Sequence, residues 1–538
     1  MKKLMSLFLC MLMLLGLVSG CGTNGDSKDA NAPTGSETQS PASSAPAAQA
    51  SGEVPASSEV KYKEDIIMGV TGKNTTLDPH EGSGSQHTFH FKMVFDSLLF
   101  LDNQTLEIKP RLATEWHTDD STTYTFKLRE DVYFHNGEPV KASDVVWTFQ
   151  RAKGSTTASS LGSIIEEVKA TDDYTVEITL TAKNVDFPYM LTMPTSSIMS
   201  EKAVADDPIE GAGVGSGAFK VDSYEFGDYV KVVRNENYWG EVTPTKSVTI
   251  RYMPEDTTRL IALETGEIDV CQDPDTLQVS YVDETPGLEL QSYIGTGVIY
   301  LGFNCSKAPF DNKDFRLAVS YGVDSQELID VARDGRGERC KSFWGWSSYG
   351  YNEGIGTNGE STAFEYNPDL AKEYLNKAYP NGGAKFTISV ISGYRKTMAE
   401  IIQAQLKKIG IEVEIAEYDT AGFNTIVSNN DHDAVVYGFG INAWADDFKR
   451  LFYTGSSNNI ANYDSPRANE LMDLAVAEED DTTRKAYYAE VQQILFDDAP
   501  YLPIYYQIGA FAVREGVSGI DYNPTSQHDP VNVYMVIE

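Results

Sequence analysis

The sequence is poor in cysteine. It has five cysteines in 538 residues, and two of them, Cys10 and Cys21, lie in or directly after an apolar N-terminal stretch. The other three are Cys271, Cys305 and Cys340, an odd number that allows at most one internal disulfide. A disulfide-built scaffold is therefore excluded, and the folded body has to be stabilised by its hydrophobic core.

Positive charge is also scarce. The chain has 43 lysine and arginine residues against 79 aspartate and glutamate residues, which gives a net charge of −36. Because a phosphate backbone would be repelled, this balance argues against nucleic acid as a partner. Hydrophobic residues make up 41% of the chain, which is enough for a large globular body. The length predicts about two to four domains.

Recognisable catalytic and cofactor motifs are absent as well. Of seven histidines, only His87 and His90 have a local spacing suited to a metal, and no cysteine or HExxH pattern supports them. The cluster GAGVGSGAF at 211–219 resembles a nucleotide-binding fingerprint, but Ser216 stands where the third glycine is required, so we expect a turn. No G-x-S-x-G nucleophile motif occurs. We therefore expect binding rather than catalysis, with no metal and no cofactor.

A hydrophobic run that could enter a membrane occurs at the N-terminus. Two lysines precede the apolar residues 4–18, a run too short for a membrane-spanning helix and typical of a secretory signal, which predicts a signal peptide over 1–20. The sequence VSGC, which ends at Cys21, resembles a bacterial lipobox with valine in place of the usual leucine. The resemblance implies that Cys21 is lipid-modified and becomes the mature N-terminus. A signal cleaved elsewhere, with Cys21 incidental, is the alternative.

Residues 21–60 predict a lipid-anchored flexible linker. The stretch is built mostly from Gly, Ser, Ala, Pro, Thr, Asn and acidic residues and has no aromatic residue, so it cannot form a core. Two acyl chains on Cys21 would hold the chain firmly at the outer face of the cell membrane. The linker would then display the folded body outside that membrane.

From residue 61 onward the sequence alternates strand and helix patterns. Residues 122–140 (TTYTFKLREDVYFHNGEPV) predict a β-hairpin with a turn at HNGEP. The next segment, KASDVVWTFQRA, predicts a helix with Ser143 as N-cap and Asp144 in its first turn. Further on, apolar residues recur at helical spacing over 398–409, Gly410 follows as a stop, and apolar and acidic residues alternate over 411–415 as in a strand. This succession indicates an α/β fold.

Several stretches together resemble the family 5 extracellular solute-binding proteins, the peptide and oligopeptide receptors of ABC importers. The stretches are LDPHEG, PRLATEW, TFKLREDVYFHNGEPVKASDVVWTFQR, GSGAFKVDSYEFGDYVKVVRNENYWG, ALETGEIDV, YLGFNCSKAPFDNKDFRLAVSYGVD, SSNNIANYDSP and RKAYYAEVQQILFDDAPYLPIYY. They occur in order and cover nearly all of residues 65–538. The identification as a member of this family therefore rests on the whole body of the chain.

The resemblance implies a bilobed periplasmic-binding-protein-like fold of the large type, with an extra subdomain on lobe I and hinge closure over the ligand. By matching motifs, the expected domains are lobe I at 61–96, 186–287 and 505–538, the inserted subdomain at 97–185, and lobe II at 288–504. The hinge is expected at two crossings, near 288–304 and 500–508. We expect a monomer that binds a peptide and the permease subunits of an ABC transporter.

The resemblance also implies a ligand-binding segment. Peptide receptors of this family carry a carboxylate in a G-W-x-A-D type segment after a strand of lobe II, and VVYGFGINAWADDF matches it at Ala445-Asp446. Asp446 is thus expected to bind the peptide's α-ammonium, although Trp444 is one position closer to the acid than in that pattern. Trp444 is expected either in the cleft wall or in the core, with Asn442 and Tyr437 as neighbours. The next residue, Asp447, is expected to be solvated or a second cation contact.

Other functions fit the same sequence less well. Within the fold, relatives take up oligosaccharides, nickel chelates or opines, and the 30 tyrosines leave a sugar ligand open. A secreted hydrolase would need a nucleophile with a base nearby, which the sequence does not assemble. A surface chaperone or adhesin could use the same fold without import.

Overall fold

The computed structural model describes residues 60–537, apart from 83, 276–277, 353–363 and 441–446. The predicted signal peptide, most of the predicted linker and Cys21 lie outside these described residues. In the described part, no helix is long and apolar enough to cross a membrane.

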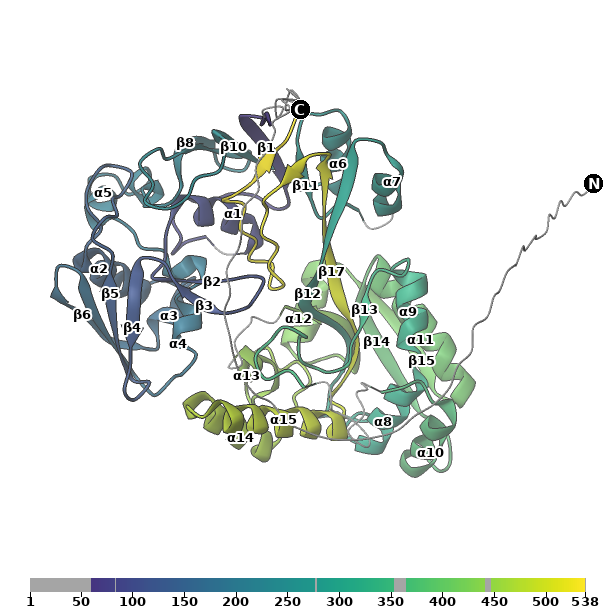
Figure 1. Cartoon of the computed structure of the whole chain (residues 1–538). Helices are drawn as coiled ribbons and strands as arrows, with labels where there is room; N and C mark the ends of the chain where they lie inside the picture. Colours follow the sequence, from purple (N-terminus) through teal and green to yellow (C-terminus); the bar gives the residue numbers. More distant parts are fainter. Residues whose placement is uncertain (1–59, 83, 276–277, 353–363, 441–446, 538) are drawn as a thin grey trace, which may run out of the picture. The chain divides into compact units, whose positions relative to one another are not determined.

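One mixed sheet of 11 strands runs through the described residues (Figure 1). Its order is β15-β14-β16-β12-β17-β11-β1-β10-β9-β8, and β13 pairs with β17 outside this path. In chain order the strands are β1 (Asp65–Val70), β8 (Phe219–Glu225), β9 (Tyr229–Arg234), β10 (Ser247–Tyr252), β11 (Val270–Gln272), β12 (Leu288–Phe303), β13 (Glu338–Arg339), β14 (Lys385–Ile391), β15 (Glu412–Tyr418), β16 (Ala434–Phe439) and β17 (Tyr501–Arg514).

The strands β12 and β17 join the two halves of this sheet. They pair antiparallel from Leu288 opposite Arg514 to Gly302 opposite Tyr501, with a register shift between Ile294 and Val298. On one side β17 pairs with β11, and on the other side β12 pairs with β16. The chain thus passes from one half to the other through these two strands. They contain most of the segments predicted as hinge crossings.

Smaller sheets lie outside the main one. A four-stranded antiparallel sheet has the order β4-β5-β7-β6, and two further sheets have two strands each, β2-β3 and β18-β19. Their strands are β2 (Leu99–Leu101), β3 (Ile108–Pro110), β4 (Ala113–His117), β5 (Thr123–Leu128), β6 (Ile165–Asp172), β7 (Thr175–Leu180), β18 (Val517–Ser518) and β19 (Tyr534–Met535). The four-stranded sheet lies entirely within the segment predicted as the inserted subdomain.

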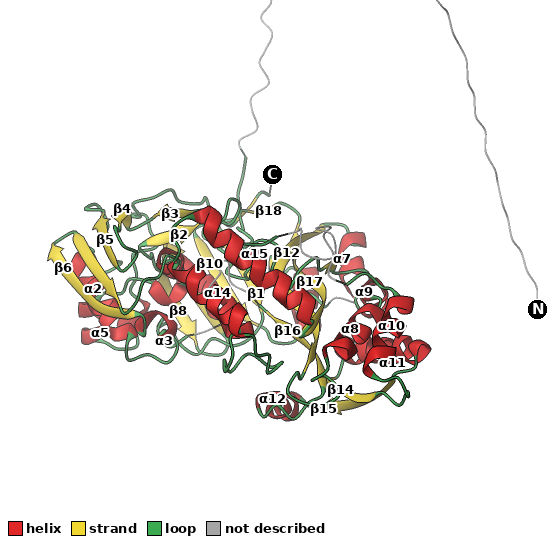
Figure 2. Cartoon of the chain, turned by 90° about the horizontal axis from the view of Figure 1, so that it is seen from below, coloured by secondary structure: helices red, strands yellow, loops and turns green. Residues whose placement is uncertain are grey.

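Helices cover these sheets, and Figure 2 shows α14 and α15 side by side on one face. The helices up to α7 are α1 (Ser85–Val94), α2 (Ala142–Ala152), α3 (Ser159–Gly162), α4 (Phe187–Met190), η1 (Pro194–Ser196), α5 (Glu201–Asp206), η2 (Gly211–Gly213), α6 (Asp256–Glu264) and α7 (Val279–Glu284). The later ones are α8 (Lys313–Gly322), α9 (Ser325–Ala332), α10 (Pro368–Ala378), α11 (Tyr394–Ile409), α12 (Thr420–Ser428), α13 (Asp447–Phe452), α14 (Pro466–Ala477) and α15 (Asp481–Asp498).

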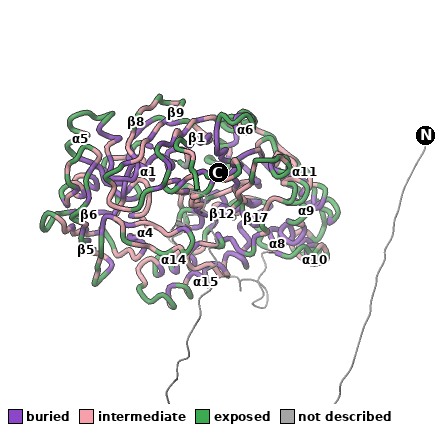
Figure 3. Tube along the Cα trace, turned by 45° about the horizontal axis from the view of Figure 1, so that its top comes forward, coloured by how far each residue is buried: buried purple, intermediate pink, exposed green. Residues whose placement is uncertain are grey.

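The buried apolar side chains form three main clusters rather than one. One cluster is confined to residues 298–506, a second combines residues 66–95 and 199–270 with 511–535, and a third lies within 98–198. In Figure 3, the trace near β12 and β17 is largely buried, whereas that of α5 is largely exposed. Separate cores permit the bodies to move against one another, although the predicted domain limits themselves stay a prediction.

The predicted β-hairpin over 122–140 is confirmed at its turn and wrong for its long first strand. The first half forms β5, but β5 pairs with β4 on one side and with β7 on the other. Around the HNGEP turn the chain does fold back on itself: Phe134 N–H donates to the carbonyl of Glu138 (2.8 Å), Val140 N–H donates to that of Val132 (3.0 Å), and Tyr133 and Pro139 form an isolated bridge. Strong local alternation marked the strand correctly, whereas its partners lie elsewhere in the sequence.

The two predicted helices and the strand after the second of them occur where the sequence predicts them. α11 ends at Ile409, with Gly410 in the left-handed conformation (φ 97°), and β15 follows at once, as predicted. α2 also occurs as predicted, but the prediction of Ser143 as its N-cap was wrong. The N-cap is Lys141, because Asp144 accepts a hydrogen bond from the backbone N–H of Lys141 at 2.9 Å.

Candidate functional site

A polar cavity of about 330 Å³ lies beside the crossing of β12 and β17. Its walls come from both halves of the main sheet, since Asp273 follows β11 whereas Arg333 and Gly440 follow α9 and β16. The other lining residues belong to the crossing strands and to the C-terminal loop: Tyr293, Gly295, Thr296, Gly297, Gln507, Ile508, Gly509, Pro524, Thr525 and Ser526. We refer to this space as the crossing cavity.

Glycines in the crossing strands allow large side chains to lie across them. A Cβ atom at Gly509 would lie 2.2 Å from the ring of Tyr293, and one at Gly297 would lie 2.5 Å from the side-chain oxygen of Gln507. The register shift between Ile294 and Val298 falls at the same place. The crossing is therefore built around these two side chains, which line the crossing cavity.

The Tyr293 ring is held in a fixed position on one wall. It stacks on Tyr522, with 5.8 Å between centroids and 3° between the planes, and it meets His528 edge-on at 4.6 Å. Because Nδ1 of His528 accepts from the N–H of Asn523 (3.1 Å), its Nε2 carries the proton and donates to the Tyr293 hydroxyl (3.0 Å). Burial lowers the pKa of His528 to about 3, so the imidazole is neutral.

Asp273 places a carboxylate in the same cavity. The residue is exposed to solvent at the cavity. Desolvation by the surrounding protein raises the pKa of its carboxyl group to about 6, whereas the positive charge of Arg259 lowers it. The backbone of Asp273 has φ 46°, a conformation that aspartate tolerates better than most residues. At pH 7 most of this carboxyl group is ionised.

Arg333, directly after α9, also lines the cavity and belongs to the segment predicted as lobe II. Its guanidinium carbon lies 4.5 Å from the centroid of the Tyr394 ring and 6.0 Å from that of Tyr505. Cation–π contacts of this kind orient the guanidinium group without neutralising its charge. The crossing cavity thus has an acidic group on one wall and a basic group on the other.

The predicted ligand-binding segment begins at this cavity. Gly440 lines it and is the last described residue before 441–446. Asn442, Trp444 and Asp446 lie outside the described residues. Asp447, directly after them, begins α13. The ligand contacts expected from Asn442, Trp444 and Asp446 stay a prediction.

Tyr437 lies three residues before Gly440, on β16. Its ring stacks on Phe423 at 5.8 Å, meets Tyr300 edge-on at 6.2 Å, and carries the guanidinium of Arg395 at 5.6 Å. The side chain is partly buried against the core of residues 298–506. The packing explains its position without a ligand, and a contact to a ligand stays a prediction.

A small apolar cavity lies beneath α13, next to the same segment. It measures about 20 Å³, roughly the space that one water molecule needs. Its lining residues are Val298, Tyr300, Phe343, Phe439, Leu451, Phe452, Tyr501 and Pro503. The end of β16 therefore separates a polar space from an apolar one.

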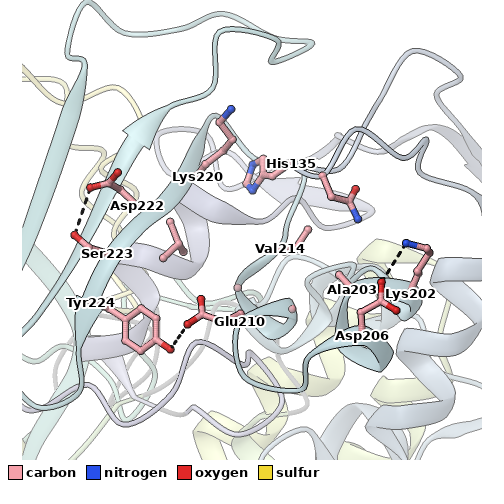
Figure 4. Close-up of a pocket in the computed structure, with 14 residues that line it drawn as sticks. His135, Lys202, Ala203, Asp206, Glu210, Val214, Lys220, Asp222, Ser223 and Tyr224 are labelled. Carbon is pink, nitrogen blue, oxygen red and sulfur yellow. Dashed lines mark hydrogen bonds and ion pairs between the residues drawn. The ribbon is translucent and has the colours of Figure 1, made fainter.

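A wider cavity of about 810 Å³ lies elsewhere, between α5, η2 and β8 (Figure 4). Two pairs of its polar side chains interact with each other: Lys202 pairs with Asp206 at 3.1 Å, and the Tyr224 hydroxyl donates to Glu210 at 3.0 Å. Its lining residues all lie between 135 and 224, so it does not involve the crossing strands. The crossing cavity is the better candidate site.

The histidines His87 and His90 do not form a metal site with other described residues. In the described part of the chain, no group of three or more His, Cys, Asp or Glu side chains could hold a metal ion. Both histidines are buried in α1, and His90 Nδ1 lies 3.2 Å from the Tyr252 hydroxyl. Burial lowers the pKa of His90 to about 3.

The comparison with known proteins decides the family. Residues 107–462 match the family described as "Bacterial extracellular solute-binding proteins, family 5 Middle". The chain belongs to this family. The predicted family and the predicted fold class are thereby confirmed, and this solute-binding protein is not an enzyme. Proteins of its family act outside the cytoplasm and serve ABC transporters.

Individual relatives differ in the ligands that their names state. This solute-binding protein is 29% identical over 480 residues to heme-binding protein A of Haemophilus influenzae, across 82% of this chain and 86% of that protein. It is 26% identical over 490 residues to the dipeptide-binding protein of Escherichia coli, across 84% and 90%. The structure of DppA from Helicobacter pylori in complex with the peptide STSA has a TM-score of 0.71 and 26% identity, over 88% of this chain and 99% of that one.

The sequence analysis missed most of the crossing cavity. It predicted the crossing segments that contain Tyr293 and Gln507, but it did not single out Asp273 or Arg333. A weak signal was available for the strand, because the GTG at 295–297 interrupts an otherwise strand-like sequence. No local sequence motif marks Asp273, because single aspartates are common in so acidic a chain.

Proposed function

We propose that this solute-binding protein is a lipid-anchored receptor that captures peptides between two lobes and delivers them to the permease of an ABC transporter. The observation that carries the proposal is the crossing cavity, whose polar walls come from both halves of the main sheet and include Gly440, the last described residue before the predicted ligand-binding segment. The relatives named for dipeptide binding and the DppA complex with STSA support this ligand class.

Peptide chemistry suits such a cleft. An extended peptide offers backbone N–H and C=O groups that protein backbone can pair with, independent of the peptide's sequence. Its α-ammonium is the one charge that every unmodified peptide shares. Asp446 would accept a charge-assisted hydrogen bond from this group, with Asn442, Trp444 and Tyr437 around the ligand. Exclusion of water on closure would strengthen the bond.

Closure would also be the signal to the transporter. A ligand that touches both lobes stabilises the closed state by its differential affinity for that state, and the permease can favour the closed form. In this proposal β12 and β17 form the hinge, between lobe I at 61–96, 186–287 and 505–538, with its subdomain at 97–185, and lobe II at 288–504. Their register shift supplies a place for the strands to bend.

Native mass spectrometry of protein purified from its own cells tests the ligand class. We expect a heterogeneous set of bound peptides, which sequencing of the released material would identify. Copurified haem, an oligosaccharide, a nickel chelate or an opine, without peptide, would overturn the proposal. Haem is a pertinent competitor because of the relative named for it.

The lipid anchor has a separate test. Cys21→Ala removes the thioether-forming sulfur that a lipobox supplies, so we expect the protein to leave the membrane fraction and enter the medium. Fractionation followed by immunoblotting measures this, and labelling with a palmitate analogue checks the modification directly. Continued attachment of the variant would show that another feature anchors the chain.

A further inference from the structure

Asp273 lines the crossing cavity. Within the part of the chain that the structure describes, its carboxylate forms no ion pair, and the one cation whose charge acts on it is Arg259. The guanidinium of Arg259 donates its hydrogen bonds to backbone carbonyl oxygens rather than to this carboxylate. A carboxylate that is crowded by protein and still open to a cavity is a good acceptor for a cation from outside.

The backbone of the Asp273 loop is fixed by Arg259. This arginine is 1% exposed and donates to the carbonyl oxygens of Gln272 (3.0 Å) and Asp273 (2.8 Å), and also to those of Met253 (2.5 Å) and Pro254 (3.0 Å). The N–H of Asp273 in turn donates to the carbonyl of Ala510 on β17 (2.9 Å). The carboxylate is therefore preorganised, which lowers the entropic cost of binding a ligand.

The neighbouring groups on this wall also suit a cation. The Tyr293 ring is held in place by Tyr522 and His528, and the polar residues Thr525 and Ser526 also line the cavity. An ammonium or guanidinium group needs such acceptors around it once its water is removed. Arg333, which lines the same cavity from the segment after α9, would repel a cation that came close to it.

We propose that Asp273 forms a second cation subsite on the lobe I wall, which selects ligands with a basic side chain in addition to their α-ammonium. The bound group would be a primary ammonium or a guanidinium, as in lysine or arginine side chains. This inference rests on the proposed function and adds a preference within it. A ligand cation held by Asp273 of lobe I, together with backbone contacts to lobe II, would favour closure.

Isothermal titration calorimetry with defined peptides tests the subsite. The probes are alanine tetrapeptides in which one residue is replaced, at each position in turn, by lysine, glutamine or glutamate. We expect the wild-type protein to bind at least one lysine peptide about tenfold more tightly than its glutamine counterpart. Asp273→Asn should remove this preference and leave the affinity for the glutamine peptides unchanged.

Three variants distinguish the loss of the subsite from misfolding of the protein. Asparagine is isosteric with aspartate and also tolerates positive φ, so Asp273→Asn preserves the loop. Asp273→Glu should retain part of the preference. Asp283→Asn, on exposed α7, makes the same charge change outside the cavity and should leave the preference intact. Loss of the preference in Asp283→Asn would overturn the assignment to Asp273.

The pH dependence gives an independent readout. The charged and titratable groups around the Asp273 carboxyl are Arg259, Tyr293 and Arg333. Arginine and tyrosine side chains as a class titrate well above pH 7.5, so the range from pH 5 to 7.5 reports on the carboxyl group. Since the carboxyl has a pKa of about 6, the lysine preference of the wild-type protein should weaken at pH 5. A preference that stays constant across this range would overturn the proposal.

The remaining outcomes separate this inference from the function on which it rests. Binding of all tetrapeptides without a preference for lysine, or with a preference for glutamate, would overturn the cation subsite and leave peptide capture in place. If none of the tetrapeptides binds and another solute copurifies, peptide capture itself fails, and the subsite assignment fails with it.

Discussion

At the residue scale, the neighbouring acids Asp446 and Asp447 provide a matched pair. We predict that Asp446→Asn weakens the binding of free-amine peptides about tenfold or more, because the α-ammonium loses a charge-assisted hydrogen bond. N-acetylated peptides, which have no ammonium, should be affected far less. Calorimetry with each peptide in both forms measures the difference. Asp447→Asn is the control, and equal losses for both peptide forms in Asp446→Asn would contradict the assignment.

A single candidate residue can be named from a sequence only where a local motif marks it, and the role of Asp446 stays such a prediction. The G-W-x-A-D type segment pointed to Asp446, and the structure brings the described residue Gly440 at its start to the crossing cavity. Asp273 could not be found in this way, because its exposure to the cavity depends on Arg259 and on a hydrogen bond to β17. Contacts of this kind join residues far apart in the sequence, which one sequence does not reveal.

At the scale of the elements, the crossing of β12 and β17 depends on a glycine. We predict that Gly509→Ala lowers the free energy of unfolding by about 1–3 kcal/mol, because its Cβ would lie 2.2 Å from the Tyr293 ring. That ring has little freedom to move, since Tyr522 and His528 pack against it. Denaturant unfolding followed by fluorescence measures the effect.

A second glycine gives the control for this prediction. Gly154→Ala adds the same methyl group, but the nearest atom to its Cβ would be the carbonyl oxygen of Arg151 at 3.6 Å, an ordinary contact. We expect little change in stability for this variant. A Gly509→Ala protein as stable as the wild type would mean that the Tyr293 ring moves aside easily, and the wall of the crossing cavity would then be soft.

The elements also show which part of a fold can be predicted from a sequence. α11 and β15 were predicted with Gly410 between them, because helical periodicity and a left-handed stop are local properties. In the hairpin over 122–140 the turn was predicted correctly, but the partner of the first strand was not, because β5 pairs with β7, which lies some fifty residues further along the chain. A strand that is well marked locally says nothing about distant partners.

At the scale of the whole molecule, the predicted lobes meet at a second place besides the crossing strands. Arg484 of α15 forms an ion pair with Asp186 at 2.5 Å, and these side chains are only 8% and 1% exposed. Next to it, the N–H of Val185 donates to the carbonyl of Val476 at 3.3 Å, and Lys183 pairs with Glu479 at 2.9 Å. By the predicted limits, these contacts join lobe I and its subdomain to lobe II, so an opening motion would break them.

This junction leads to a prediction about closure. In Asp186→Asn the charge of Arg484 would be buried beside an uncharged partner. The free energy of the state in which this junction is formed should therefore rise strongly. Ligand affinity should therefore fall about tenfold, for roughly 1.4 kcal/mol, although neither residue lines the crossing cavity. Small-angle scattering of the ligand-free variant should show a larger radius of gyration. Glu490→Gln is the control: it removes an exposed acid of α15 that pairs with Arg467 of α14, and we expect no change in either measurement. Unchanged affinity and scattering for Asp186→Asn would mean that the junction persists in both states, and closure would then have to pivot around it rather than separate it.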